Sequence, residues 1–231
     1  MNNLKVTPRI KELNLLRLKN RLISISHRVE VKDRFPSPIS NLMGVDVAYS
    51  GEYATAAGIS LSWPDLKILG KYSQTSLMRF PYISSLLSFR EGTAIIRLIK
   101  SLETKPDILM VNAHGIAHPL LCGCASYIGV LTDTPTIGVA KRIICGETLR
   151  PRAGAKIAYV EFSGMAVAAI LNSDDKSKQI VISPGHRISL KSAVQVTLKT
   201  LSGGRLPAPI QLAHIEASRL THKALNKTQI I

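Results

Sequence analysis

The sequence predicts a mixed α/β domain in which three antiparallel strands continue into a parallel β-α-β run. Three strand-like segments follow one another through short connections, and short connections join antiparallel neighbours. Helical and strand patterns then alternate, which is typical of parallel strands joined by crossover helices. The chain has 231 residues, of which 45% are hydrophobic. We therefore expect one domain over residues 1–231 and exclude intrinsic disorder, which requires lower hydrophobicity.

The chain opens with a predicted basic amphipathic helix from about residue 7 to residue 29, where apolar residues recur near helical spacing between Lys and Arg. Such a helix can bind a membrane or nucleic acid, but it more often packs on its own domain, and we expect packing. Three segments rich in Val, Ile, Leu and small residues follow. They predict strands at residues 42–49, 55–62 and 66–74.

The clearest helix is predicted at residues 83–102, where apolar residues form one face and Pro106 prevents continuation. The rest of the chain is predicted by the same patterns. Its expected elements are strand 107–111, helix 120–132, strand 136–140, a sheet of 157–162, 165–171 and 179–183, helices 190–201 and 210–225, and a loose tail at 226–231.

Charge points to a polyanionic partner. Thirty Lys and Arg oppose fifteen Asp and Glu, which gives a formal charge of +15 and a pI near 10.0. Nucleic acid is the usual partner of such a surface, although a solvated basic surface or adaptation to a hot or saline habitat is the alternative. Aromatic residues make up only 5%, too few for a platform that stacks several bases.

Cellular location follows from three weaker signals. No run of roughly 18 apolar residues is present, so we expect no transmembrane helix and no membrane partner. The N-terminus is interrupted by charge and does not resemble a secretory signal. The cysteines are Cys122, Cys124 and Cys145. An odd, small number argues against a disulfide framework and for the reducing cytoplasm, and no second Cys or His pair completes a zinc site.

Two carboxylates stand in apolar surroundings. Asp46 lies between Val45 and Val47 in the first predicted strand, where burial is costly unless a cation or a basic side chain compensates, and both options stay open. Glu91 follows an apolar residue by four and precedes another by four, so it falls on the apolar stripe of its predicted helix. The alternative for Glu91 is a place at the edge of the stripe, paired with Arg90 or a nearby Lys.

A polar loop follows the strand at 107–111. It begins at Asn112 and contains His114 and His118. Sites of open α/β sheets form at such strand ends, although a histidine there is as often structural. Asp46, Glu91 and Asn112 would together offer oxygen ligands, which suit Mg²⁺ or Mn²⁺ better than zinc. A basic protein with such a site is expected to act on phosphodiester bonds.

Several motifs together resemble the endonuclease V family, the deoxyinosine 3′ endonucleases. The resemblance runs in family order from about residue 44 to residue 219 and implies a ribonuclease H-like fold. The matching motifs are 44–47 (GVDV), 80–83 (FPYI), 88–92 (SFREG), 114–119 (HGIAHP), 135–141 (PTIGVAK), 182–186 (ISPGH), 205–209 (RLPAP) and 212–214 (LAH).

The resemblance implies an enzyme that recognises deaminated adenine, as inosine in DNA or RNA, and cuts the second phosphodiester bond 3′ to it with Mg²⁺ or, as a substitute, Mn²⁺. It assigns metal binding to Asp46, Glu91 and Asn112, and places His214 near the metal. It assigns a phosphate contact to Lys141. Pro81, Tyr82 and Ile83 would form a wedge that fills the space of the displaced base. The implied base pocket is lined by Gly115, His118 and Gly123.

Three positions depart from the family pattern. The wedge usually has a second Pro where this chain has Ser84. The third carboxylate is usually Asp, followed by Gly, where this chain has Asn112 and Ala113. A neutral amide offers a carbonyl oxygen but removes one negative charge from the ligand set. Asp107 and Asp133 do not fall at the expected strand end and are poor substitutes.

Three hypotheses therefore stand. The leading one is an inosine-directed repair endonuclease, monomeric and cytoplasmic. The second is a catalytically weakened or inactive inosine-binding protein, which Asn112 motivates. The third is a general ribonuclease H-like nuclease, which the wedge and the glycine-containing pocket disfavour. His186, in a predicted turn at 184–186, stays open between turn capping and substrate contact.

Overall fold

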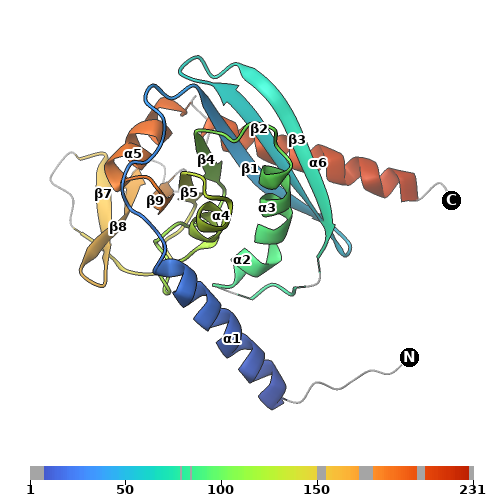
Figure 1. Ribbon diagram of the computed structural model, residues 1–231, viewed down its shortest axis with the longest axis horizontal. Helices are drawn as coiled ribbons and strands as arrows, with labels where there is room; N and C mark the ends of the chain where they lie inside the picture. The colour runs from blue at the N-terminus through green and yellow to red at the C-terminus, as the bar shows by residue number, and fades with distance from the viewer. Residues whose placement is uncertain are drawn as a thin grey trace.

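The computed structural model (Figure 1) describes residues 8–78, 80–83, 85–149, 155–171, 179–201 and 206–228, with side chains from residue 14 to residue 221. Within these ranges the strands form one nine-stranded sheet in the order β3-β2-β1-β4-β5-β9-β8-β7-β6. The strands are β1 (Asn41–Ser50), β2 (Tyr53–Ser62), β3 (Ile68–Leu77), β4 (Ile108–Val111), β5 (Thr136–Ala140), β6 (Glu147–Thr148), β7 (Ile157–Phe162), β8 (Met165–Leu171) and β9 (Ile180–His186).

The pairing confirms the predicted mixed sheet. Strand β2 runs antiparallel to both β1 and β3, whereas β1, β4 and β5 are mutually parallel neighbours. Strand β9 then returns antiparallel to β5 and carries the β8–β7–β6 meander. Connection length explains this order. The short β1–β2 and β2–β3 loops favour hairpins, whereas the longer, helical connection after β3 lets β4 pair parallel to β1.

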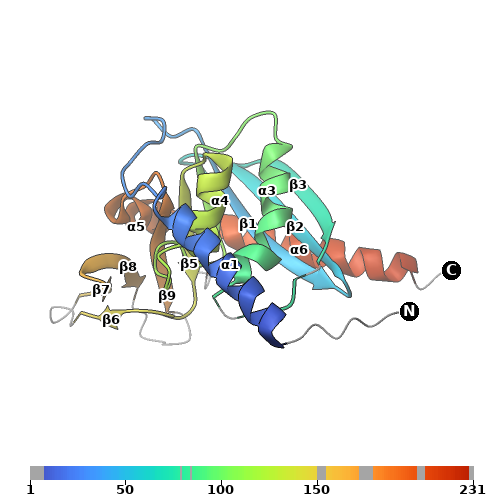
Figure 2. The ribbon, with the colours of Figure 1, turned by 60° about the horizontal axis from the view of Figure 1, so that its bottom comes forward.

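Helices cover both faces of the sheet (Figures 1 and 2). Helices α5 and α6 pack on one face, and α3 and α4 on the other. The alternation of β1 separates the two cores: Leu42 packs with Ile210 of α6, whereas Met43 and Val45 pack with the α3 and α4 side. The helices are α1 (Pro8–Ser26), α2 (Leu87–Arg90), α3 (Gly92–Lys100), α4 (Cys124–Thr132), α5 (Leu190–Lys199) and α6 (Ala208–Thr228).

The prediction of one continuous helix at 83–102 was wrong, because the segment forms two separate helices. Helix α2 starts only at Leu87, because Ser85 adopts a left-handed φ of 64° that a right-handed helix cannot contain. Glu91 then separates α2 from α3, with φ −102° and ψ −33°. Its N–H still donates to Leu87 O and its own carbonyl accepts from Ala94, so the chain turns with little loss of backbone hydrogen bonding.

Other boundaries also differ. Helix α4 begins at Cys124 rather than 120, because Leu121 has φ 50° and Gly123 is extended. Residues 184–186 are not a turn but the end of β9. Helix α6 continues to Thr228, so the tail expected to be loose from 226 is helical there, and residues 229–231 lie outside the described residues. The two-residue strand β6 was not predicted.

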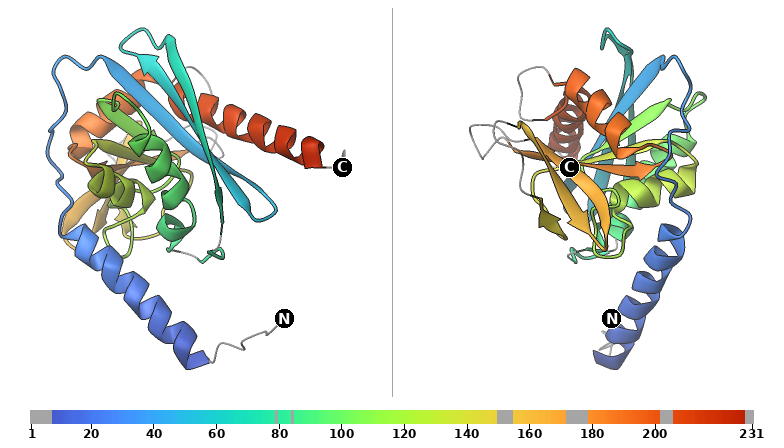
Figure 3. Two further views of the ribbon diagram at one scale, coloured as in Figure 1. Left: turned by 45° about the vertical axis from the view of Figure 1, so that its right-hand side comes forward. Right: turned by 90° about the vertical axis from the view of Figure 1, so that its left-hand side faces the viewer.

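Helix α1 extends away from the body of the protein (Figure 3). Leu22 and Ile25, in its last turns, are buried against Leu86, Cys122 and Tyr127, which confirms that the helix packs on the domain. Among the described residues, no helix combines the length and the apolar character that a transmembrane segment needs. All three cysteines are free, and Cys122 and Cys124 are buried as small apolar residues, as expected.

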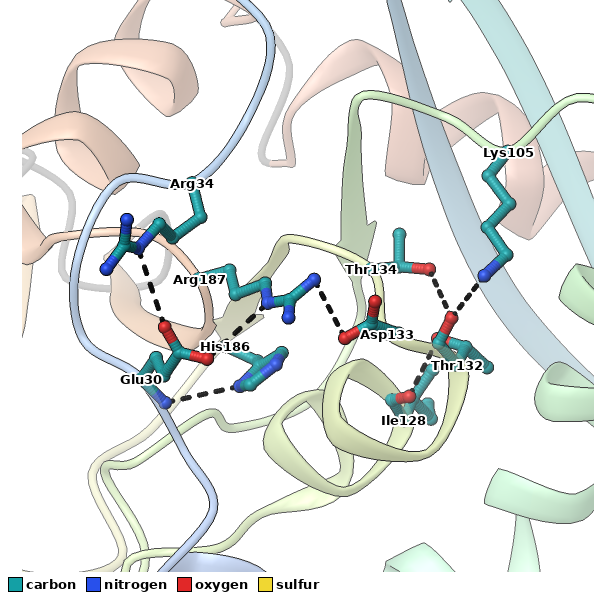
Figure 4. Close-up of polar contacts among 9 residues, drawn as sticks. All are labelled: Glu30, Arg34, Lys105, Ile128, Thr132, Asp133, Thr134, His186 and Arg187. Atoms are coloured by element: carbon teal, nitrogen blue, oxygen red, sulfur yellow. Dashed lines mark hydrogen bonds and ion pairs between the residues drawn. The ribbon is translucent and has the colours of Figure 1, made fainter.

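The segment that leaves α1 is fastened to the amino end of β5 and the end of β9 (Figure 4). The Glu30 N–H donates to His186 Nδ1 at 3.2 Å, and the Arg187 N–H donates to Glu30 O at 2.6 Å. The Arg187 guanidinium pairs with Asp133 at 2.8 Å and lies 3.6 Å from the Glu30 carboxylate. His186 therefore has a structural partner here, and burial lowers the pKa of its imidazole.

The packing of α1 predicts that two of its leucines contribute very differently to the free energy of unfolding. Leu22→Ala should lower the free energy of unfolding by about 2–5 kcal/mol, because Leu22 is 0% exposed and its removal leaves a cavity. Leu16→Ala, at a residue 55% exposed, should change it by no more than about 0.5 kcal/mol. Urea unfolding measures both values. If α1 docked without stabilising the domain, the two variants would unfold alike.

Candidate active site at the carboxyl ends of the parallel strands

Asp46 and Asn112 lie side by side on neighbouring parallel strands. Val45 of β1 is paired with Val111 of β4, so the next residue on each strand is at the same level and points to the same face. Asn112 Nδ2 donates a hydrogen bond to Asp46 Oδ1 at 3.0 Å. The amide nitrogen faces the carboxylate because only the nitrogen can donate.

His214 completes the surroundings of Asp46. It projects from α6, and its Nδ1 lies 2.6 Å from Asp46 Oδ2. Helix α6 can approach β1 this closely because of Gly44: a Cβ at that position would lie 2.1 Å from the carbonyl carbon of Pro209. Asp46 is only 8% exposed, and its two oxygens bond to an amide and an imidazole, not to the Lys or Arg that the sequence left open.

Glu91 faces Asp46 from the break between α2 and α3. The Tyr49 hydroxyl donates to Glu91 Oε1. Burial raises the pKa of the Glu91 carboxyl to about 7, and the negative charge of Asp46 adds to this rise, whereas the Tyr49 hydrogen bond and the positive charge of Arg90 oppose it. The hydrogen-bond partner of Glu91 is thus a tyrosine, not the Arg90 or Lys considered from the sequence.

Tyr49 and Arg90 surround Glu91, and neither residue was predicted from the sequence to belong to the site. The Arg90 guanidinium lies 4.7 Å from the centroid of the Tyr49 ring, and its Nη1 donates to the Phe80 carbonyl at 3.0 Å. Tyr49 is three residues after Asp46, so strand alternation points it to the opposite face, towards α2 and α3. That alternation was the only available signal, because the residue stands in no motif of its own.

A pocket of about 160 Å³ lies close to Glu91. A cavity of similar size holds a ring such as benzene. Cys124 connects the wall of the pocket to Glu91, because the pKa of the Cys124 thiol is raised first by burial and then by the negative charge of Glu91. The pocket is lined by Tyr82, Ser85, Leu87, Ser88, Ala113, His114, His118, Gly123, Cys124 and Ile144.

The glycines of the pocket loop permit contact between backbones. A Cβ at Gly123 would lie 2.3 Å from the carbonyl oxygen of His114, so no larger residue fits where Gly123 borders the pocket. Gly115 is not among the lining residues. It packs against β9, where a Cβ would lie 1.9 Å from Pro184 O, and its N–H donates to Ser183 Oγ at 2.7 Å. Gly115 therefore positions the pocket loop against β9 without lining the pocket itself.

His118 ties the pocket loop to the segment after Tyr82. Its Nδ1 accepts the Leu120 N–H at 3.2 Å, so Nε2 carries the proton and donates to Ser85 O at 2.9 Å. The imidazole is 3% exposed, and burial lowers its pKa to about 4. A neutral His118 is thus a structural brace at one wall of the pocket.

The remaining predicted residues lie around this centre. Tyr82 is 72% exposed at the rim of the pocket with Pro81 beside it, while Ile83 packs beneath, against the Leu86 cluster. Lys141 directly follows β5 and is exposed. Among the described contacts, none joins Lys141 to Asp46, Glu91 or Asn112. Ser84 and Arg205, which the motif comparison singled out, lie outside the described residues.

The donor atoms of Asp46, Glu91 and Asn112 are of the kind that a hard cation prefers, but their combined negative charge is one less than three carboxylates would have. Asp46, Glu91 and Asn112 all carry oxygen donors, which Mg²⁺ and Mn²⁺ prefer. Within the described residues, however, no group of three His, Cys, Asp or Glu side chains is placed to hold a metal ion. In this structure the amide nitrogen of Asn112 faces the Asp46 carboxylate, so a direct hydrogen bond joins two of the three oxygen-bearing side chains.

The state of His118 predicts how stability depends on pH. Because its pKa falls from 6.5 to about 4 on folding, acid protonates the unfolded chain first, so stability is full above pH 6.5 and declines as the pH falls towards 4. Between pH 7.5 and 5 the loss from this residue should be roughly 2 kcal/mol. The measurement is the unfolding free energy of the wild type minus that of His118→Gln at each pH. A difference that does not change with pH would contradict the assignment.

Comparison with known proteins identifies the family. The family model described as Endonuclease V matches residues 23–215. The endonuclease V of Thermofilum pendens is 35% identical over 209 residues, which cover 90% of this chain and 89% of that protein. The catalytic domain of human endonuclease V superposes with a TM-score of 0.83 at 27% identity, over 93% of this chain and 98% of that one.

A second solved structure shares the fold. Ciona intestinalis endonuclease V, in complex with a 24mer DNA containing an inosine followed by a ribo-adenosine, superposes with a TM-score of 0.80 at 24% identity, over 94% of this chain and 99% of that one. These superpositions confirm the ribonuclease H-like architecture expected from the sequence. With the family model spanning most of its length, the chain belongs to the endonuclease V family.

Proposed function

We propose that the protein is an endonuclease that recognises inosine in nucleic acid and hydrolyses the second phosphodiester bond 3′ to it, with Mg²⁺ or, as a substitute, Mn²⁺. The observation that carries the proposal is the adjacency of two parts. The carboxylate of Glu91, whose charge interacts with that of Asp46, also acts on Cys124 in the wall of a ring-sized pocket, and the exposed Tyr82 stands at the rim of this pocket. A relative of the same fold has been solved with inosine-containing DNA, which supports this substrate.

Each part of the site has a role in this proposal. A cation held by Asp46, Glu91 and Asn112 would activate water and stabilise the leaving oxygen. His214 orients Asp46 through their 2.6 Å contact. Lys141 offers a point charge to a phosphate near the scissile bond. Tyr82 fills the gap that the displaced base leaves, and His118 and Gly123 border the pocket that receives this base.

A second candidate is an inosine-binding protein that cuts slowly or not at all. The hydrogen bond from Asn112 Nδ2 to Asp46 Oδ1 favours it. That bond satisfies the carboxylate without a cation, and the neutral amide lowers the attraction for one. Asn112 does not line the base pocket, so a protein with this residue could still bind inosine while cutting inefficiently.

A nicking assay separates the two candidates. An end-labelled strand with one inosine, as DNA and as RNA, is incubated with the protein in Mg²⁺ and separately in Mn²⁺. We expect a nick at the second bond 3′ to inosine, absent with Asp46→Ala. Asn112→Asp should raise the rate in Mg²⁺ roughly tenfold or more, because the third ligand regains its charge.

The outcomes of this assay are distinct. Nicking by Asn112→Asp alone would support the binding protein over the enzyme. Nicking by neither protein, or nicking that ignores inosine, would refute the proposed function.

The wedge role of Tyr82 predicts a loss of selectivity. Tyr82→Ala should reduce the preference for inosine over undamaged strands roughly tenfold, because one base–aromatic contact is lost when the lesion leaves the stack. Tyr159→Ala is the matched control, since Tyr159 is an exposed tyrosine on the distant strand β7. Binding constants for both strands give the ratio. Equal losses of affinity on both strands would contradict the wedge.

A further inference from the structure

A second hollow lies on the other side of α2 from the base pocket. Leu87 and Ser88 line the pocket, whereas the next two residues, Phe89 and Arg90, line a groove of about 470 Å³. One turn of helix therefore separates the two spaces. The groove is lined by Leu77, Met78, Phe80, Phe89, Arg90, Thr93 and Arg97.

The lining of this groove is cationic and aromatic. Arg90 and Arg97 contribute two guanidinium groups, and no lining residue is an Asp or Glu. Neither arginine takes part in an ion pair among the described residues. Arg97, which is exposed, donates to the neutral Ser76 hydroxyl at 3.4 Å, so its charge is not compensated there.

The aromatic walls are held in place. The Phe80 and Phe89 ring centroids are 5.9 Å apart, and Phe89 meets Tyr127 edge-on at 5.5 Å. Arg90 is fixed by its hydrogen bond to the Phe80 carbonyl and its place over the Tyr49 ring. The groove is thus built before any ligand arrives, which limits the entropy that binding costs.

We propose that this groove binds a second nucleotide of the bound nucleic acid, with its phosphate on Arg97 and its base against Phe80. The proposal rests on the proposed function and extends it. Guanidinium forks match phosphate oxygens, and aromatic rings stack on bases without regard to sequence. Phe80 is two residues from Tyr82, a span of at most about 7 Å, so a strand held at the wedge passes the groove.

Two sources can supply this nucleotide: the strand that carries the inosine, or the strand opposite to it. If the inosine strand supplies it, the groove should contribute to the binding of single-stranded substrates as well as duplexes. If the opposite strand supplies it, the groove should contribute to the binding of duplexes only. Both share the same chemistry, and the choice of substrate separates them.

The test compares two substitutions on one helix. Arg97→Gln removes the proposed phosphate contact, while Lys100→Gln removes an equal charge from an exposed residue of α3 that does not line the groove. Fluorescence anisotropy measures the dissociation constants of labelled single strands and duplexes, with and without inosine, over a series of salt concentrations. Thermal unfolding of each variant checks that the fold is retained.

Arg97→Gln should weaken binding roughly tenfold, as expected for one hydrogen bond to a charged group. It should also reduce the slope of log affinity against log salt by about 0.9 on duplexes or about 0.7 on single strands. A loss on both substrates identifies the inosine strand, and a loss on duplexes alone identifies the opposite strand. Wild-type affinity in Arg97→Gln, or an equal loss in Lys100→Gln, would overturn the proposal.

The same data separate this proposal from the function on which it rests. The inosine preference should be unchanged in Arg97→Gln, because the groove reads no lesion. A wild-type protein without inosine preference would refute the proposed function even if Arg97→Gln weakened general binding. A wild-type protein that prefers inosine, with an unaffected Arg97→Gln, would refute the groove alone.

Discussion

The close packing of α6 against β1 at Gly44 is the constraint on which the candidate site depends. The backbone of Pro209 occupies the space where a side chain at position 44 would stand. His214 is five residues further along α6, so this contact fixes the position of its imidazole over Asp46. Gly44 and Asp46 are two residues apart and point to the same face of β1. A side chain at position 44 would therefore displace the helix together with the histidine.

Charge balance explains how Asp46 is accommodated in this site without a Lys or Arg partner among the described contacts. Two carboxylates near one another in a buried place repel, and the raised pKa of Glu91 reflects burial first and this repulsion second. A third carboxylate at position 112 would add to the repulsion unless a cation were bound. Asn112 instead donates to Asp46, which stabilises the metal-free protein. In the proposed function the same neutral amide would weaken the attraction for a cation, so stability and catalytic power would oppose one another at this residue.

Much of the sheet could be predicted from the sequence, because hydrophobic patterns and connection lengths determine which strands pair. The sequence predicted that Asp46 in the first strand and Asn112 after the strand at 107–111 could converge, and the parallel pairing of β1 with β4 places them together. The helix boundaries at Ser85 and Leu121 could not be predicted, since a left-handed φ in a residue other than glycine leaves no signature in the sequence. Tyr49 was missed for a different reason: its contact with Glu91 depends on where the helix breaks.

The break at Glu91 has a consequence for both sides of α2. Glu91 was expected on the apolar stripe of one long helix; in the structure it is partly buried and stands between two helices rather than inside one. A continuous helix would keep its side chain in a fixed rotation relative to Arg90 and Ile95. The interruption lets the carboxylate turn to Tyr49, within the electrostatic reach of Asp46.

The interruption also leaves α2 as a single turn with a different hollow on each side. Leu87 and Ser88 border the ring-sized pocket, and Phe89 and Arg90 border the cationic groove. Arg90 links this turn to Phe80 and to the Tyr49 ring. Since Tyr49 also donates a hydrogen bond to Glu91, a chain of packed groups connects the segment around Tyr82 to this carboxylate. In the proposed function, the short helix thereby connects the part that would contact the strand with the residue that would hold the cation.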